Sequence, residues 1–370
     1  MNNTHPQTNN PEPQKTGIKA FFRKYERHAS WIAFIAGFTS DNLMLRRIDL
    51  LVDQLLLFSY LLVAGAGIIL YNKLDSSKPR SRFTNWIPFF IQFAFGALFS
   101  GFFVFYSRSA SLVASWPFVL FLLTMLFGNE HLRHHYSRLT LQLSIYFIVA
   151  FSFSIFMVPT LTHSMGPVIF VISGLVSLLI IRVMMRILRA VAPDNYMKGR
   201  AFSIFWIIVI YATFNILYFK NIIPPIPLSL KDIGIYHNIE KSPDGNYTLT
   251  YEHRPWYDLK NRFTHTFHYE KGETVYAYSA IFAPTKLNTV VLHKWSYFDE
   301  TRKVWVETNS VAFPIVGGAD GGYRGYTIKT NIQPGKWRVD VTTARDQLLG
   351  RIQFTVASAE KAPELLTKVR

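Results

Sequence analysis

The chain has 370 residues, a formal net charge of +16 and no cysteine. Without cysteine it has no disulfide, no thiolate nucleophile and no cysteine-ligated metal. Charged residues make up 17% of the sequence, which is low for a soluble protein. The basic residues stand in short stretches between apolar blocks, where they orient membrane helices. They do not form the basic face of a folded domain that nucleic acid would need, so we expect a lipid bilayer, and no nucleic acid, as a partner.

Residues 1–28 are predicted to be a disordered, basic tail. The opening 16 residues are rich in Asn, Pro and Thr and contain no apolar run. They therefore have neither the composition of a folded core nor the apolar segment of a signal peptide. The basic residues of this tail are Lys15, Lys19, Arg23, Lys24 and Arg27.

Residues 29–220 are predicted to form a helical membrane bundle. Six apolar blocks have the length of membrane spans: Leu50–Tyr71, Asn85–Tyr106, Ala110–Phe127, Leu139–Leu161, Met165–Ile181 and Ala201–Phe219. At a rise of about 1.5 Å per residue, each block covers roughly the 30 Å of hydrocarbon in a bilayer. We expect helices because a single spanning segment must bond every backbone N–H within itself.

The charges of the connecting segments predict a seventh span and an orientation. Basic residues concentrate in three connections, within 73–82, 133–138 and 182–200, while the alternate connections carry almost none. The positive-inside rule places these three connections in the cytoplasm and everything after Lys220 outside. The basic tail then also lies in the cytoplasm only if Ala29–Leu45 crosses as well. We therefore predict about seven helices in a bacterial inner membrane, with a cytoplasmic N-terminus and a periplasmic C-terminal domain.

The rest of the chain is predicted to be a proline-stiffened linker (221–236), an all-β domain (237–358) and a C-terminal tail (359–370). Seven segments alternate apolar and polar residues between turn signals: Tyr247–Glu252, Thr274–Phe282, Thr289–Phe298, Val304–Phe313, Arg324–Thr330, Trp337–Thr343 and Arg351–Val356. Seven short antiparallel strands at this spacing are typical of an immunoglobulin-like sandwich. In one strand Trp337, Val339 and Val341 share a face predicted to be buried, opposite Arg338 and Asp340, which are predicted to face water.

Several motifs of the β region resemble one bacterial family. They are VYAYSAI at Val275–Ile281, His293-Lys294-Trp295, Tyr323-Arg324-Gly325-Tyr326 and Gly335-Lys336-Trp337-Arg338-Val339. From about Val275 to Val356 the chain resembles the bacterial domain of unknown function family 2914. Ala36–Leu57 also looks like the opening of the membrane region attached to that domain in some members. The resemblance implies a protein of the cell envelope and supplies no activity.

The first candidate site is a polar cluster at the start of the Leu50–Tyr71 block. Its main ionisable members are Asp41, Arg46, Asp49 and Asp53. Ionisable residues near or within membrane spans are costly and often functional. On a helix Asp49 and Asp53 would share a face, and Arg46 could pair with Asp49. The cluster could line a polar cavity for an ion, a proton or a lipid head group, or it could be a salt-bridge cluster that fixes a helix junction. We favour the second interpretation.

The second candidate site is a surface of the β domain that carries His293, Trp295 and Arg324. Exposed aromatic side chains of this kind bind glycans or peptides. The core of a sandwich would contain the same aromatic residues, and for Trp295 and Trp337 we favour a core position. No metal site is expected, because the histidine-rich run at Glu130–His135 lacks the His-Glu-x-x-His order of zinc proteases.

The sequence contains no P-loop, dinucleotide fingerprint, serine-hydrolase elbow or zinc-protease motif. We therefore predict a non-enzymatic envelope protein, without cofactor or metal, whose periplasmic sandwich binds an envelope protein or a cell-wall glycan. The alternative is a transporter or membrane-embedded enzyme that acts on a lipid or small solute through the Asp41–Asp53 cluster.

Overall fold

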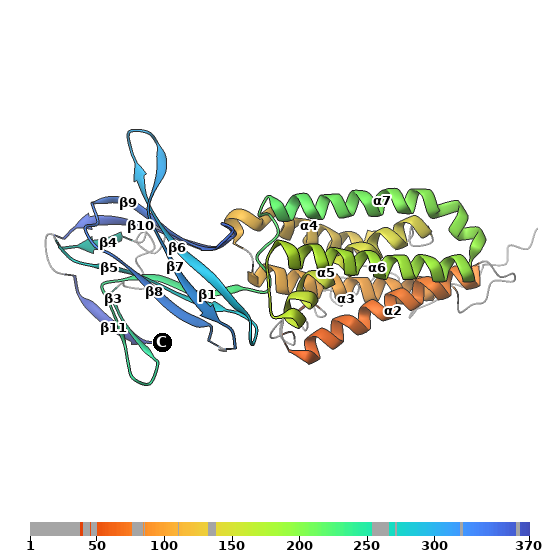
Figure 1. Ribbon diagram of the computed structural model, residues 1–370, viewed down its shortest axis with the longest axis horizontal. Helices are drawn as coiled ribbons and strands as arrows, with labels where there is room; N and C mark the ends of the chain where they lie inside the picture. Colours follow the sequence, from red (N-terminus) through yellow and green to blue (C-terminus); the bar gives the residue numbers. More distant parts are fainter. Residues whose placement is uncertain are drawn as a thin grey trace, which may run out of the picture. The chain divides into compact units, whose positions relative to one another are not determined.

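The computed structural model describes residues 38–39, 45, 50–75, 84, 86–109, 111–131, 138–253, 266–270, 272–318, 321–359 and 363–370. Apart from residues 38 and 39, these all belong to one compact unit, Leu45–Arg370. Within the described ranges, six main helices come first and eleven strands follow (Figure 1). The prediction of a helical region followed by a β domain is confirmed at this level.

The six helices correspond to the six apolar blocks of the sequence. They are α2 (Leu51–Asp75), α3 (Ile87–Ser109), α4 (Leu112–His131), α5 (Leu139–Thr162), α6 (Pro167–Val191) and α7 (Pro193–Phe219). Five of the helices in the described part, all except α4, are long and apolar enough to cross a membrane. The chain is therefore a membrane protein. The predicted first span, Ala29–Leu45, lies outside the described residues except at positions 38, 39 and 45.

The last two helices are longer than their apolar blocks. α6 continues to Val191 and α7 begins at Pro193, so the basic segment predicted as a connection is helical except at Ala192. Arg and Lys are good helix formers, and proline at the first position of a helix is favourable because no hydrogen bond is needed there. The apolar block therefore ends at Ile181, whereas helix α6 continues to Val191.

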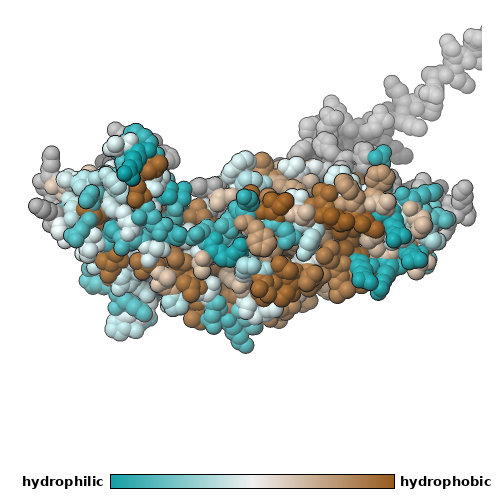
Figure 2. Space-filling model, turned by 45° about the horizontal axis from the view of Figure 1, so that its top comes forward, coloured by the Kyte–Doolittle hydropathy of each residue, from teal (hydrophilic) through white to brown (hydrophobic). Residues whose placement is uncertain are grey.

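The helix α5 is the centre of the bundle. It is buried on nearly all sides and contacts α2, α3, α6 and α7. Its Phe151 ring stacks on Phe214 of α7 with centroids 4.8 Å apart, and Gln142 accepts a 2.7 Å hydrogen bond from Asn72 of α2. Ring packing and buried hydrogen bonds of this kind hold helices together in lipid, where apolar surface alone gives no driving force. Figure 2 shows apolar residues gathered over the helical region.

The strands form three sheets. Their bounds are β1 (Ser229–Tyr236), β2 (Asn238–Lys241), β3 (Tyr247–Glu252), β4 (Thr266–Tyr269), β5 (Val275–Phe282), β6 (Asn288–Asp299), β7 (Val304–Val316), β8 (Tyr323–Lys329), β9 (Gly335–Thr343), β10 (Leu348–Ser358) and β11 (Leu365–Val369). The sheet orders are β1-β5-β8, β4-β10-β9-β6-β7 and β11-β3-β2. All neighbours are antiparallel except β4 and β10, which are parallel.

The sheet that contains β5 is covered on both faces. Val275 and Ala277 of β5 pack in one core with Trp295 and Trp337 of the five-stranded sheet. Tyr278, on the opposite face of β5, packs against residues of β2 and β3 in a separate cluster. Because successive side chains of a strand point to opposite faces, the domain has three layers around β5.

All seven predicted strands are present, as β3 and β5 to β10. The alternation did not reveal β1, β2, β4 and β11. β1 lies in the predicted linker and β11 in the predicted C-terminal tail. β2 and β4 have four residues each, which is too short for a period of two to be recognised.

The predicted buried face of β9 is confirmed, and the opposite face needs a correction. Trp337, Val339 and Val341 are buried. Asp340 was predicted to face water, but it is buried as well. Its carboxylate accepts two hydrogen bonds from Arg351 of β10, at 2.5 and 2.8 Å. This two-point contact compensates the carboxylate for its lost hydration.

Candidate binding site in the β domain

Of the four ionisable residues in the predicted polar cluster at the start of the Leu50–Tyr71 block, the structure describes one. Asp41, Arg46 and Asp49 lie outside the described residues. Asp53 is buried in the first turn of α2 and interacts electrostatically with Arg108 at the end of α3. Arg108 also donates a 2.7 Å hydrogen bond to the carbonyl oxygen of Leu45. Asp53 thus lies within electrostatic range of a basic residue of another helix, which sequence spacing had not linked to it.

His293 and Trp295 lie in the core of the β domain. Neither has exposed surface. The two imidazole nitrogens of His293 are 2.8 Å from Ser279 Oγ and 2.9 Å from Thr327 Oγ1, and Trp295 Nε1 donates to the same Thr327 oxygen at 3.0 Å. Burial lowers the pKa of His293 to about 4, so its ring is neutral at physiological pH. The structure therefore places this pair away from any surface that a ligand could touch.

Arg324, the remaining predicted residue, is half-buried on β8. One guanidinium nitrogen lies 3.4 Å from Asn246 Oδ1, and its carbonyl oxygen accepts from Tyr247 Oη at 3.4 Å. Both contacts join β8 to the β2–β3 hairpin, so the described contacts of Arg324 connect two sheets.

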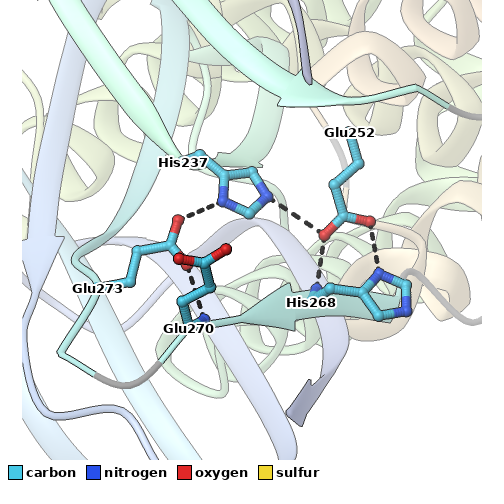
Figure 3. Close-up of polar contacts among 5 residues, drawn as sticks. All are labelled: His237, Glu252, His268, Glu270 and Glu273. Atoms are coloured by element: carbon cyan, nitrogen blue, oxygen red, sulfur yellow. Dashed lines mark hydrogen bonds and ion pairs between the residues drawn. The ribbon is translucent and has the colours of Figure 1, made fainter. Parts of the chain in front are cut away.

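A different group of charged side chains gathers where β1, β3 and β4 meet (Figure 3). His237, between β1 and β2, is buried, and its ring stacks on Phe267 of β4 at 4.1 Å. Its Nε2 atom lies 3.2 Å from Glu252 Oε1, and its Nδ1 atom contacts Glu273 Oε1. Glu252 also accepts from the backbone N–H of His268 at 2.5 Å and contacts His268 Nδ1 at 2.9 Å.

The geometry indicates that His237 is protonated. Both of its ring nitrogens face carboxylate oxygens, and only the imidazolium form can donate from both. Burial alone would lower the pKa of His237, but its hydrogen bonds to Glu252 and Glu273 and their charges outweigh burial and raise it. Burial would raise the pKa of Glu252, but hydrogen bonds from His237 and His268 lower it. The folded domain therefore stabilises a buried cation between two anions.

His237 and Glu252 of this charged group form one wall of a pocket of about 480 Å³. Tyr236 and Tyr251 form another wall, and the ammonium group of Lys368 lies 5.0 and 5.2 Å from their ring centroids. Apolar side chains, including Ile352 and Phe354 of β10, complete the lining. Burial lowers the pKa of Lys368, partly opposed by Asp232. A volume of this size with a few converging polar groups is typical of small-ligand sites.

Gly234 allows the Tyr236 ring to take its position in the wall of this pocket. A Cβ atom on Gly234 would lie 2.6 Å from Tyr236 Oη and 2.7 Å from its ring, which is closer than non-bonded atoms approach. The tyrosine ring therefore lies over the backbone of β1 because position 234 has no side chain. Sequence inspection missed this site because His237, Glu252 and Glu273 are far apart in the chain and stand at strand ends, where alternation gives no signal.

The charged group is not arranged as a metal centre. Within the described ranges, no three His, Asp or Glu side chains are placed to hold a metal ion. The arrangement offers fixed donors and acceptors beside aromatic rings, which suits recognition of a polar ligand.

A known protein family matches the part of the chain that forms most of the five-stranded sheet. Residues 288–356, which run from β6 through most of β10, match a protein family model. The family is "Protein of unknown function (DUF2914)". The resemblance found in the sequence is thereby confirmed for this stretch. His237, Glu252 and Glu273 lie outside the part that matches DUF2914, whereas Ile352 and Phe354 of the pocket lie inside it.

Solved structures add no information on function. No curated protein matches the chain. A β-glucosidase from Listeria innocua in complex with gluconolactone is 10% identical over 34% of this chain, with a TM-score of 0.19. An alkylpurine DNA glycosylase from Pseudomonas fluorescens, bound to DNA, is 10% identical over 74% of this chain and 78% of its own, with a TM-score of 0.22. The chain spans 16% of the β-glucosidase's length. Both TM-scores are too low to indicate a shared fold.

Proposed function

We propose that this chain is a non-enzymatic binding protein of the bacterial inner membrane, whose β domain holds a cell-wall glycan in the Tyr236–Tyr251 pocket on the periplasmic side. About seven helices would anchor it, with Ala29–Leu45 as the first. The β1-β5-β8 sheet packs face to face on the five-stranded sheet. These two sheets would correspond to the two layers of an immunoglobulin-like sandwich.

The pocket carries this proposal. Tyrosine rings offer the flat apolar faces on which sugar rings stack, together with a hydroxyl that can hydrogen-bond. The neighbouring Glu252 and Lys368 supply an acceptor and a donor for sugar hydroxyls. The salt bridge between His237 and the two glutamates fixes the polar wall before a ligand arrives, which lowers the entropic cost of binding.

Binding of soluble cell-wall oligosaccharides to the purified full-length protein tests the proposal. We expect saturable binding in calorimetry and at least a tenfold loss of affinity in Tyr251→Ala, which removes one stacking face. A matched control is Tyr276→Ala, a partly exposed tyrosine of β5 that does not line the pocket. Absence of binding to wild-type protein, or an equal loss in both variants, would refute the glycan assignment.

A second candidate, a protein partner, is favoured by the edge strand β7. This strand pairs with β6 alone and stands at the edge of its sheet. It runs for 13 residues and is exposed at most positions, including Val304, Val306 and Val311. A long, apolar, exposed edge is a template on which another chain can add a strand. A crosslinker placed at Val306 should capture one protein in cells, whereas one placed at the exposed Thr330, which directly follows β8, should not. Equal capture at both would remove this candidate.

A further inference from the structure

An open groove of about 870 Å³ lies within the helical bundle, formed mainly by α2, α5 and α7. It is separate from the β-domain pocket and from the Asp53–Arg108 pair. Two contacts frame it. On one side Asn72 of α2 hydrogen-bonds to Gln142 of α5 at 2.7 Å. On the other side Gly199 of α7 packs directly on Leu139 of α5, where an added Cβ would lie 3.4 Å from Leu139 Cδ2.

The groove has a basic mouth and an apolar floor. Arg138 directly precedes α5, and Lys198 lies in the second turn of α7; both line the mouth and both are exposed. Asp75 is the one acidic residue among its described lining residues, so the mouth carries a net positive charge. Beyond it the lining includes Ile145 and Ile148 of α5.

The length of the groove matches one leaflet of a bilayer. Ile148 is ten residues along α5 from Arg138, and Ile210 is twelve residues along α7 from Lys198. At a helical rise of about 1.5 Å per residue these separations are roughly 15 and 18 Å, close to half of the 30 Å hydrocarbon thickness. An acyl chain that starts at the basic mouth would therefore reach about the bilayer centre.

We propose that this groove is a binding site for one anionic phospholipid, with the phosphate near Arg138 and Lys198 and an acyl chain along α5 and α7. Basic pockets between membrane helices attract acidic head groups. A zwitterionic lipid would fill the apolar part equally well but would gain less from the positive mouth. Free phosphate would use the mouth and leave the apolar floor empty. Charge and shape together select the anionic lipid.

The proposal is tested by exchanging the purified protein into nanodiscs of phosphatidylcholine with a minor fraction of phosphatidylglycerol, and by measuring retained lipid in native mass spectra. We expect wild-type protein to retain phosphatidylglycerol over phosphatidylcholine. The double variant Arg138→Gln/Lys198→Gln should retain at least fivefold less. The matched control is Arg182→Gln/Arg186→Gln, which removes the same charge from exposed positions of α6 that do not line the groove.

A third variant tests the apolar part. Ser144→Phe would fill the groove without changing its charge, since Ser144 lines it from α5, and should also lower phosphatidylglycerol retention. If Ser144→Phe fails to assemble, the two charge variants still decide the matter, because all four of their positions are exposed. Equal retention of both lipids by wild-type protein, or equal losses in the two charge variants, would overturn the site. A groove filled by protein, whether a second copy or another segment of this chain, would show as retention unaffected by any variant.

Discussion

His237 gives the β domain a specific dependence of stability on pH. Its pKa is raised by Glu252 and Glu273 despite burial, so the folded state binds the proton more tightly than the unfolded state does. This contribution is fully present below the unfolded pKa of about 6.5 and is lost as pH rises through the higher folded value. For Glu252, whose pKa is lowered, the contribution is present above about 4.5 and is lost as pH falls through the lower folded value.

We therefore predict that the free energy of unfolding of the β domain is highest between about pH 4.5 and 6.5 with respect to these two groups. His237→Gln should destabilise the domain by about 3–5 kcal/mol near pH 6, because removal of one member of a buried pair leaves charge uncompensated. It should also flatten the decline above pH 6.5. Denaturant unfolding of the detergent-solubilised protein across pH 4–9 measures both effects. An unchanged slope in His237→Gln would mean that another group titrates.

Trp337 and Arg338 are neighbours in sequence with opposite surroundings. Trp337 is buried with Trp295 and Phe354, and its Nε1 atom donates to Gln333 O at 2.8 Å. Arg338 lies on the other face, where its guanidinium stacks on the Trp305 ring at 4.8 Å. Trp337→Ala should destabilise the domain by about 3–5 kcal/mol, the usual cost of deleting a large core aromatic. Arg338→Ala should cost less, about 1–2 kcal/mol, because the half-buried Arg338 side chain lies 3.5 Å from Asp340, which would keep its two hydrogen bonds from Arg351. Equal shifts in a thermal melt would contradict this assignment of faces.

At the scale of elements, the sequence predicted the helices and most of the strands because their patterns extend over enough residues. The six apolar blocks became helices, and every strand with clear alternation was found. The missed features depend on contacts between distant segments. Nothing near Phe267 indicates that β4 pairs in parallel with β10, and nothing near Asp340 indicates that Arg351 lies opposite it on β10.

The same limit applies to the candidate site. Each residue of the Tyr236–Tyr251 pocket has an ordinary local sequence, and the pocket exists because β1, β3, β4, β10 and β11 bring residues from five separate strands together. By contrast, His293 and Trp295 belong to a recognisable sequence motif. Their side chains form a buried hydrogen-bonded group around Thr327 and not a binding surface. In this domain the local motif marks packing, and the pocket arises from topology.

One element boundary depends on a glycine. Gly317 follows β7, and its backbone N–H donates to Leu287 O at 2.9 Å. A Cβ atom there would lie 1.7 Å from the carbonyl oxygen of Pro284, so the two backbones must separate if a side chain is added. Gly317→Ala should destabilise the domain by about 2–3 kcal/mol, since neighbouring backbone hydrogen bonds would be lost. Gly321→Ala is the control, because its Cβ would meet only the end of the long Arg324 side chain, at 3.3 Å, and no backbone atom. Matching melting temperatures for the two variants would show that the turn adapts.

At the scale of the whole molecule, the positions of the charges along the helices support the proposed direction of the chain through the membrane. Arg182, Arg186 and Arg189 lie in the second half of α6, and Lys198 and Arg200 in the first half of α7. These two helix ends meet at Ala192. The far end of α7 leads into β1, and the last turn of α7 contains no basic residue. From the positive-inside rule we expect the Ala192 end on the cytoplasmic side and the β domain on the periplasmic side, as proposed above.

The last prediction tests this orientation with reporters that are active on one side of the membrane only. Alkaline phosphatase needs the oxidising periplasm to form its disulfides, so a fusion after Arg370 should be active and a fusion within 79–82 should be inactive. A reporter that works in the cytoplasm should give the reverse pattern at both sites. Replacing Arg182, Arg186 and Arg189 by Gln should weaken the preference, because the charge difference that orients α6 and α7 becomes smaller. Phosphatase activity from the 79–82 fusion together with inactivity at Arg370 would invert the topology, and it would place the Tyr236–Tyr251 pocket where no cell-wall glycan is present.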